Sequence, residues 1–268
     1  MLRAYLKSIA DAIRTKLGIT NTINAQEFPN KVNEVYEKGR TDEWSEFWDE
    51  FQQNGTRTRY DYAFVGTISG YSGFSWTDVT FKPKHDIKPI GSISNMFYGV
   101  GFTDFKGILE RQGIVFDTSK VTTASNVFGF AQYMTHAPEI NLTSVTVAGN
   151  ARGIFSWCTS LEVVDKLTLR EDGSNTLVEF FKQCKQLKEV RFGGVIGQDI
   201  SFLHSPLLST DTVIDAILHF KNYAGTSNAG KYLTLHDNTK TAMANLGAIP
   251  EFNNKTYDAY LADIGWCL

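Results

Sequence analysis

The sequence lacks every short motif that commonly marks an enzyme active site. It contains no Walker A loop, no dinucleotide-binding fingerprint, no G-x-S-x-G nucleophile motif, and no H-E-x-x-H or C-x-x-C metal motif. Its five histidines never lie four residues apart, the spacing at which two of them would face one metal ion from a helix. We therefore expect a protein that is not an enzyme and that binds neither a metal nor a cofactor.

Charge of one sign and long apolar runs are also missing. The net charge of −3 comes from 29 acidic and 26 basic residues spread along the chain, so no basic patch favours nucleic acid as a partner. No apolar run approaches the length of a membrane span, and acidic Asp11 lies where a signal peptide would carry its apolar core. We expect synthesis in the cytoplasm, no membrane span and no export signal.

What the chain does contain is an internal repeat, which is easiest to see from four residue pairs that end in phenylalanine. The pairs are Met96-Phe97, Val127-Phe128, Ile154-Phe155 and Phe180-Phe181, and we call their second members the anchors. The anchors are 31, 27 and 26 residues apart (128−97, 155−128 and 181−155). Related residues recur three and six positions after each anchor: Val100, Ala131, Cys158 and Cys184 at the first, and Thr103, Met134, Leu161 and Leu187 at the second.

A period of this length, with Phe, Cys and Leu at fixed offsets, is typical of a leucine-rich-repeat solenoid, in which each repeat gives one short strand and one helix or helical turn. A single repeat cannot bury its apolar side alone, so stacking turns each recurring position into a continuous ladder. The sequence thus predicts an α/β fold, an irregular leucine-rich-repeat solenoid, with all four anchors buried in register.

Several stretches of this repeat match known sequence motifs. They are F-D-T-S-K-V-T at 116–122, S-N-M-F at 94–97, S-N-V-F at 125–128 and F-S-W-C-T-S-L-E-V-V at 155–164. Residues 94–195 resemble the irregular leucine-rich repeats of BspA-like bacterial surface proteins. The resemblance implies a binding function without naming a ligand.

The first residues carry a second resemblance. Leu6, Ile9 and Ile13 share one face of a predicted helix, and Gly18 ends it. The wording L-x-x-I-A-D-A-I-R-x-K-x-G from Leu6, followed by Phe28-Pro29, resembles the amino-terminal segment of tail-fibre, baseplate and related virion proteins from phages and prophages of Firmicutes. That resemblance implies a structural protein of a virion.

An aromatic stripe follows on a further predicted helix, which Thr41 can cap. Its spacing places four large side chains on one face: Trp44, Phe47, Trp48 and Phe51. Such a stripe is either core within the chain or a surface for assembly with other virion proteins. We assign it to assembly, because the stripe is large for a helix with few neighbours to pack against.

The chain divides by these patterns into four segments. Residues 1–55 form an N-terminal helical attachment segment, 56–93 a strand-rich N-terminal cap, 94–205 the leucine-rich repeats and 206–268 a C-terminal α/β cap. In the last segment, Ser209 or Thr210 is expected to cap a helix, 232–235 to form a strand and Asp237 to cap another helix.

Two positions of the repeat bear on chemistry. Cys158 and Cys184 occupy equal places in consecutive repeats, at a spacing near that of a disulfide, although buried reduced thiols suit a protein made in the cytoplasm better. Two residues after each anchor the side chain should point outward, and Phe130 and Trp157 stand there in neighbouring copies. Adjacent exposed aromatics suit sugar rings or a protein partner, and packing against a flanking cap is the alternative.

Two classes of function fit these observations. In the first, the chain is a non-enzymatic phage virion protein of tail-fibre or baseplate type, located in the virion, whose repeats bind a host surface glycan or protein or serve assembly with other virion proteins or further copies of the chain. In the alternative, it is a bacterial leucine-rich-repeat protein at the cell surface that mediates protein or glycan adhesion. The absence of an export signal favours the first.

Overall fold

The computed structural model describes residues 11, 77–78, 81, 83, 86–147 and 149–268. The chain separates into two compact units, Met1–Thr56 and Arg57–Leu268, and the strands from Gly91 onward and the helices from Phe105 onward belong to the second. Apart from Asp11, which is helical, the predicted N-terminal helices lie outside the described residues. The same holds for the aromatic stripe of Trp44, Phe47, Trp48 and Phe51 and for most of the segment 56–93 that was expected to form a cap.

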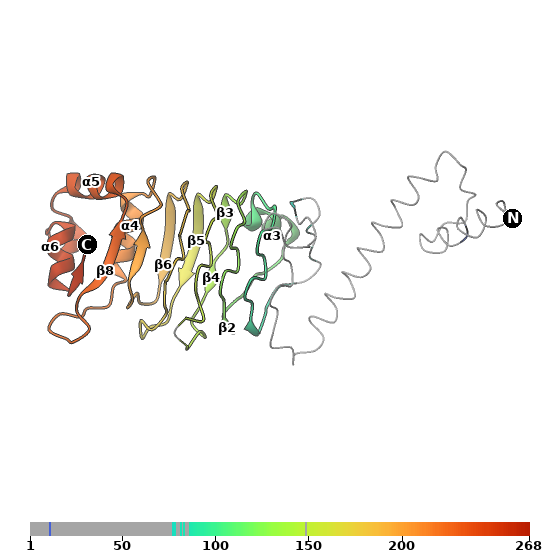
Figure 1. Ribbon diagram of the computed structural model, residues 1–268, viewed down its shortest axis with the longest axis horizontal. Helices are drawn as coiled ribbons and strands as arrows, with labels where there is room; N and C mark the ends of the chain where they lie inside the picture. Colours follow the sequence, from blue (N-terminus) through green and yellow to red (C-terminus); the bar gives the residue numbers. More distant parts are fainter. Residues whose placement is uncertain (1–10, 12–76, 79–80, 82, 84–85, 148) are drawn as a thin grey trace. The chain divides into compact units, whose positions relative to one another are not determined.

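The described part of the second unit contains three small parallel sheets (Figure 1). The first pairs β1 (Gly91–Ser92) with β2 (Val121–Thr123). In the second, β5 (Val163–Thr168) pairs with β3 (His136–Ala137), β4 (Ile140–Asn141) and β6 (Glu189–Gly193). The third has the order β7 (Ile200–Phe202), β8 (Lys231–Leu235) and β9 (Trp266–Cys267).

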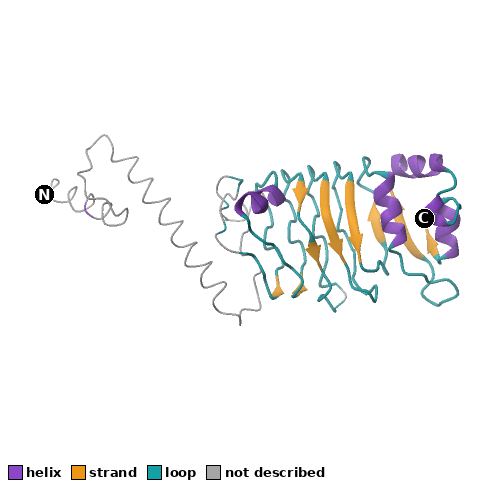
Figure 2. Ribbon diagram, turned by 180° about the vertical axis from the view of Figure 1, so that it is seen from behind, coloured by secondary structure: helices purple, strands orange, loops and turns teal. Residues whose placement is uncertain are grey.

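In residues 86–147 and 149–268, most of the helices gather near the C terminus (Figure 2). Between residues 86 and 120, the described chain forms the helix α3 (Phe105–Gln112), which precedes β2. The others all follow β7: α4 (Thr210–Leu218), α5 (Asp237–Leu246), the short 3₁₀ helix η2 (Pro250–Phe252) and α6 (Tyr257–Asp263).

The expected α/β leucine-rich-repeat solenoid is therefore wrong. That fold needs a strand and a helix or helical turn in each repeat, whereas the structure is mixed, with small parallel sheets, and has no helix in the described residues between β2 and β7. The backbone gives the reason. Two residues before and two residues after the anchor Phe128, Asn126 and Phe130 have left-handed φ values of 51° and 59°. A left-handed residue at every fourth position prevents a right-handed helical turn from continuing.

The repeats nevertheless pair with each other through one recurring backbone ladder. The N–H groups of Asn126, Phe128 and Phe130 donate to the carbonyl oxygens of residues 152, 154 and 156 in the next repeat, at 2.7, 2.9 and 2.8 Å. The same three offsets link the repeat of Phe97 to that of Phe128, and the repeat of Phe155 to that of Phe181. Successive repeats consequently lie side by side (Figure 1).

The anchors form the centre of the core. Their rings stack with centroid separations of 5.4 Å for Phe97 and Phe128, 5.7 Å for Phe128 and Phe155, and 6.0 Å for Phe155 and Phe181. All four are buried, which confirms the expectation that they lie in register. Parallel offset rings at these distances add attraction beyond the burial of their area.

A fifth anchor, which the sequence patterns did not predict, continues the stack. Phe202 stacks on Phe181 at 5.1 Å, and buried Ser205 and Leu208 follow it by three and six residues. Its distance from the previous anchor is 21 residues (202−181), shorter than the other spacings. The sequence F-L-H-S-P-L-L at 202–208 could have indicated this repeat, because Ser205 and Leu208 stand three and six residues after Phe202, as in the other repeats.

The residues after 206 follow the expected elements closely. Ser209 is the N-cap of α4, and its hydroxyl accepts a hydrogen bond from the N–H of Thr212 at 3.2 Å. The expected cap Asp237 is wrong by one residue, because a ring nitrogen of His236 accepts the N–H of Asn238 and α5 begins at Asp237. Buried Trp266 stacks on Phe220 at 3.8 Å within this C-terminal segment.

Candidate functional site

Three aromatic side chains from successive repeats form a line, which we call the aromatic row: Tyr98, Phe130 and Trp157. The rings of Phe130 and Trp157 stack with a centroid separation of 5.5 Å and an interplanar angle of 14°. The ring of Tyr98 lies 5.3 Å from that of Phe130, tilted by 44°. Phe130 and Trp157 are thus stacked neighbours, as the sequence predicted.

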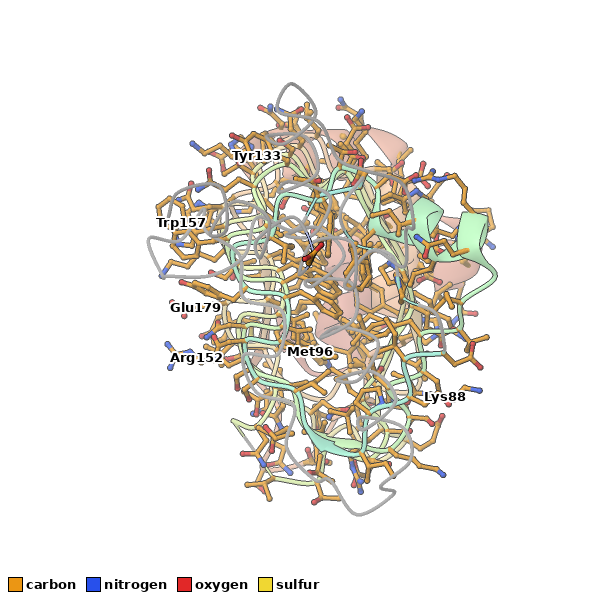
Figure 3. The ribbon with its side chains drawn as sticks, turned by 90° about the vertical axis from the view of Figure 1, so that its right-hand side faces the viewer. Lys88, Met96, Tyr133, Arg152, Trp157 and Glu179 are labelled. Carbon is orange, nitrogen blue, oxygen red and sulfur yellow. The ribbon has the colours of Figure 1, made fainter. Side chains whose placement is uncertain are left out.

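The row lies on the outside of the stack. The side chain of Phe130 is half-buried and Trp157 keeps 38% of its surface exposed. Seen along the stack, Tyr133, Arg152, Trp157 and Glu179 lie on one side of it, Met96 lies inside and Lys88 lies on the opposite side (Figure 3). The row and its neighbours therefore share one flank of the second unit.

Tyr98 was missed because it stands one residue, and not two, after its anchor. The place two after Phe97 is taken by Gly99, so the ring comes from the preceding residue instead. Gly129 makes room for it, since a Cβ atom at that position would lie 2.8 Å from the Tyr98 ring. The adjacent Tyr-Gly in one repeat and Gly-Phe in the next is the signal that could have indicated this contact.

Phe130 and Trp157 are held in a backbone conformation that suits glycine. Their φ values are 59° and 66°, and at the same place in the first repeat Gly99 has a φ of 66°. A left-handed backbone costs a residue with a Cβ atom roughly 1–2 kcal/mol. The ladder maintains it, because the N–H groups of Phe130 and Trp157 donate to residues 156 and 182 at 2.8 and 2.7 Å. Strain of this kind is concentrated at functional sites in proteins.

The stacking leaves part of each ring face accessible. Rings in van der Waals contact lie about 3.5–4.0 Å apart. For the 5.5 Å centroid separation of Phe130 and Trp157, that contact distance implies a sideways offset of about 4 Å. The two rings are therefore arranged like steps, and each ring leaves part of its face uncovered by the next.

A charged group borders the row at Trp157. The carboxylate of Glu179 accepts hydrogen bonds from Lys182 at 2.7 Å and from Arg152 at 2.9 Å. These two bonds, that from Lys182 first, lower the pKa of Glu179 from its ordinary value. Glu179 itself has a left-handed φ of 57°, at the place two residues before its anchor. One carboxylate thus engages two cations, and the cluster keeps a net charge of +1 (two positive charges and one negative).

A second polar cluster lies beside the strands and has a structural explanation. The carboxylate of Asp165 on β5 contacts His136 at 2.8 Å and Lys106 of α3 at 3.3 Å. Lys106 also contacts Glu110 at 3.0 Å within α3. This arrangement ties α3 to the sheet and leaves both carboxylate oxygens of Asp165 occupied.

The cysteines do not form a reactive site. Cys158 and Cys184 are buried and free, so the disulfide that their spacing allowed is absent. Their thiols donate to the carbonyl oxygens of Phe128 and Phe155 at 3.0 and 3.1 Å. Burial raises the pKa of both thiols, which disfavours the nucleophilic thiolate.

The rest of the described chain contains neither a cluster of metal ligands nor a helix that could span a membrane. Within residues 86–147 and 149–268 and the few described before them, no three His, Cys, Asp or Glu residues come together as metal ligands. Nor does any helix in this part of the chain have the length and apolar character to cross a membrane.

Comparison of the chain with models of known protein families, with curated proteins and with solved structures gives no match. Function must therefore be inferred from the geometry of the aromatic row and from the sequence resemblances.

Proposed function

We propose that this chain is a non-enzymatic binding protein of a phage virion, of tail-fibre or baseplate type, and that the outward pair Phe130 and Trp157 contacts the host surface. One observation carries the proposal. Two large aromatic side chains are stacked and partly exposed at positions where the backbone is left-handed and where another repeat has glycine. Core packing does not call for such residues there, whereas recognition of a ligand does.

The scaffold supports this assignment. Each ring of the pair stands two residues after a buried anchor, on a backbone that is hydrogen-bonded to the next repeat. A side chain on such a support loses little conformational entropy when it contacts a ligand. Aromatic side chains also provide large contact areas with few rotatable bonds.

The sequence resemblances supply the setting. The wording of residues 94–195 is similar to BspA-like repeats, and the first residues are similar to virion proteins from phages of Firmicutes. In this proposal the protein is located in the virion, and the N-terminal segment with Trp44, Phe47, Trp48 and Phe51 attaches it to other virion proteins. Deleting residues 1–52 should then prevent incorporation into particles while the second unit stays folded.

The binding proposal is tested with the full chain and intact cells of a panel of Firmicutes. We expect wild-type protein to bind a subset of strains, and the double variant Phe130→Ala/Trp157→Ala to bind them at least about tenfold more weakly, a change of about 1.4 kcal/mol. The matched control is Tyr232→Ala on β8, which removes another exposed aromatic side chain, 52% accessible, outside the row. Circular dichroism must show that all variants are folded.

Two results would count against the proposal. Wild-type protein that binds no strain removes the host-surface function, and equal binding by the double variant and the wild type removes Phe130 and Trp157 as the site. The alternative function, a bacterial surface adhesin, shares the same site and differs in its gene neighbours. Adjacent tail, tape-measure, holin or endolysin genes support the virion assignment, and a sortase or secretion context supports the adhesin.

A further inference from the structure

We infer that the flank that carries Trp157 binds an acidic segment of a protein, and that this protein is the ligand on the host surface. The inference rests on the proposed function and deepens it, because it names the class of ligand and adds contact residues outside the aromatic row. Three properties of the flank support it: its register across the repeats, its apolar breadth and its charge.

The flank is formed by the same segment of each repeat, from the anchor to the residue six places later. From the second repeat to the fifth, the anchor and the residues three and six places after it are buried, so the residues between them point away from the core. The fifth repeat keeps the register, because Phe202 stacks on Phe181 at 5.1 Å. At the other end of the segment, the N–H of Ser209 donates to the carbonyl oxygen of Lys188 at 2.9 Å. Corresponding outward residues of these repeats therefore lie side by side.

Apolar side chains on this flank extend beyond the aromatic row. Tyr133 and Leu207 stand five residues after their anchors, Leu203 stands one residue after its anchor, and all three are exposed. Tyr133 lies on the same side of the stack as Trp157 (Figure 3). Three steps of 5.1 to 6.0 Å separate the repeat of Tyr133 from that of Leu207. We call Tyr133, Trp157, Leu203 and Leu207 the docking face.

The side chains of the docking face are those of protein interfaces. Tyrosine, tryptophan and arginine most often dominate the binding energy of such interfaces, and Tyr133, Trp157 and Arg152 share this side of the stack (Figure 3). Leu203 and Leu207 offer no aromatic ring for a sugar to stack on, whereas burial against apolar side chains of a protein stabilises a complex. A protein segment therefore covers the docking face better than a glycan does.

The charge of the flank favours an acidic segment. In all five repeats the stretch from the anchor to six residues later contains no Asp or Glu, and in the fourth it contains Lys182 and Lys185. Arg152 and Glu179, which precede their anchors, lie on the same side (Figure 3). Three positive charges and one negative leave +2, on a chain whose net charge is −3. The flank stays positive when Asp199 is added, whose carboxylate accepts a backbone N–H of β8 at 2.9 Å.

Lys185 is the charge most available to a ligand. It is exposed, and it belongs to the repeat between those of Trp157 and Leu203. Within residues 86–147 and 149–268, its ammonium group contacts no carboxylate. Arg152 and Lys182, by contrast, share the carboxylate of Glu179 at 2.9 and 2.7 Å. Lys185 should therefore form the main charged contact with the partner and make binding depend on salt.

The first experiment separates protein from saccharide ligands. Cells of a strain that wild-type protein binds are divided, and one portion is digested with protease while the other is oxidised with periodate, which cleaves vicinal diols of sugars. We expect binding to fall at least about tenfold after protease and to survive periodate. Binding that survives the protease, or that periodate abolishes, overturns this inference and leaves the proposed function standing. Wild-type protein that binds no intact cells overturns both.

The second experiment tests the charge with variants of the full chain on the same cells, in low and high salt. Lys185→Glu should bind at least about tenfold more weakly than wild type in low salt, and its binding should change less with salt concentration. Lys185→Arg keeps the charge and should bind as wild type does. The matched control is Lys240→Glu on α5, which should also bind normally. Wild-type affinity that does not change with salt overturns the inference, because an acidic ligand requires that dependence.

The third experiment tests the apolar part of the docking face. Leu203 and Leu207 each keep 48% of their surface exposed, and Leu218 on α4 keeps 47%, so Leu218→Ser is the matched control for Leu203→Ser/Leu207→Ser. The double variant should bind at least about tenfold more weakly while circular dichroism shows it folded, and the control should bind as wild type does. Equal binding by the double variant overturns the inference. So does a wild-type dimer in sedimentation that the double variant dissociates, because a second copy then covers the docking face.

Discussion

The thiol of Cys184 donates a hydrogen bond to the carbonyl oxygen of Phe155, 3.1 Å away, and Cys158 makes the same contact with Phe128 at 3.0 Å. In each case, a buried cysteine three residues after one anchor satisfies the backbone carbonyl of the preceding anchor. Ser205 occupies this place in the fifth repeat, and its hydroxyl donates to the carbonyl oxygen of Cys184 at 3.1 Å. The cysteines thus join neighbouring repeats as small hydrogen-bond donors.

Thiol titration should separate the three cysteines. Of these, Cys267 is exposed, whereas Cys158 and Cys184 are buried. A thiol reagent should therefore modify one thiol quickly in native protein and three after denaturation. Cys267→Ser should abolish the fast reaction, and fast modification of a second thiol in that variant would contradict the observed burial.

The two buried thiols should also make stability depend on alkaline pH. Burial raises their pKa in the folded state above that in the unfolded chain. Their contribution is complete below the unfolded pKa of about 8.5 and decreases as the pH rises above it, because the unfolded state ionises first. The free energy of unfolding should fall more steeply between about pH 8 and 10 in wild-type protein than in Cys158→Ala/Cys184→Ala. Identical slopes would contradict this assignment.

Replacing a central anchor should cost much of the stability. Phe155 is buried between Phe128 and Phe181, so Phe155→Ala removes two stacking contacts and leaves a cavity. We expect a loss of about 3–5 kcal/mol in the free energy of unfolding, measured with denaturant. Val115→Ala, at an exposed position, serves as the control and should change stability by less than about 0.5 kcal/mol. A small effect of Phe155→Ala would argue against a continuous core.

Backbone strain at Trp157 predicts an unusual order of stability. Alanine at this position keeps the strain of a left-handed φ of 66°, whereas glycine relieves it. Trp157→Gly should thus be more stable than Trp157→Ala by about 1 kcal/mol in denaturant unfolding, although glycine normally lowers stability. Both variants lack the ring and should bind equally weakly. An alanine variant more stable than the glycine variant would contradict the strain.

The motif at 116–122 contains a testable turn. The carboxylate of Asp117 accepts the N–H of Ser119 at 2.8 Å, and this bond is the main cause of a lowered pKa for Asp117. Asp117→Ala should lower the free energy of unfolding by about 1 kcal/mol, and Asp117→Asn, which keeps an acceptor, by less. Because the folded pKa is depressed, this contribution is present above the unfolded pKa of about 3.9 and is lost as the pH falls through the folded value. A pH-independent difference between wild type and Asp117→Asn would contradict it.

Burial could be predicted from this sequence far better than backbone conformation. The anchors and the cap Ser209 were found because apolar spacing and capping residues report directly on local contacts. The missing helices could not be foreseen in the same way. Asn126 and Gly153 tolerate a left-handed backbone, but nothing in Phe130, Trp157 or Glu179 favours it, and the conformation is imposed by hydrogen bonds to the next repeat.

The candidate site was predicted in part. The positions two after the anchors led to Phe130 and Trp157, whereas Tyr98 required knowledge of a contact with Gly129 in another repeat. Such a contact depends on which backbone atoms face each other across the ladder. The adjacent Tyr98-Gly99 and Gly129-Phe130 pairs indicate the contact only once the pairing of the two repeats is known.

The recurring ladder gives the stack no preferred length. The repeats of Phe97, Phe128 and Phe155 each offer the next repeat the same three donors, and the next repeat accepts them through the same three carbonyl groups. A unit inserted or removed in phase among them would therefore find matching partners on both sides. Recombination within a gene could therefore add or delete whole repeats without redesigning any junction. Each added unit with an aromatic residue two places after its anchor would lengthen the row by one ring, and reach along a ligand would change stepwise while the core stayed the same.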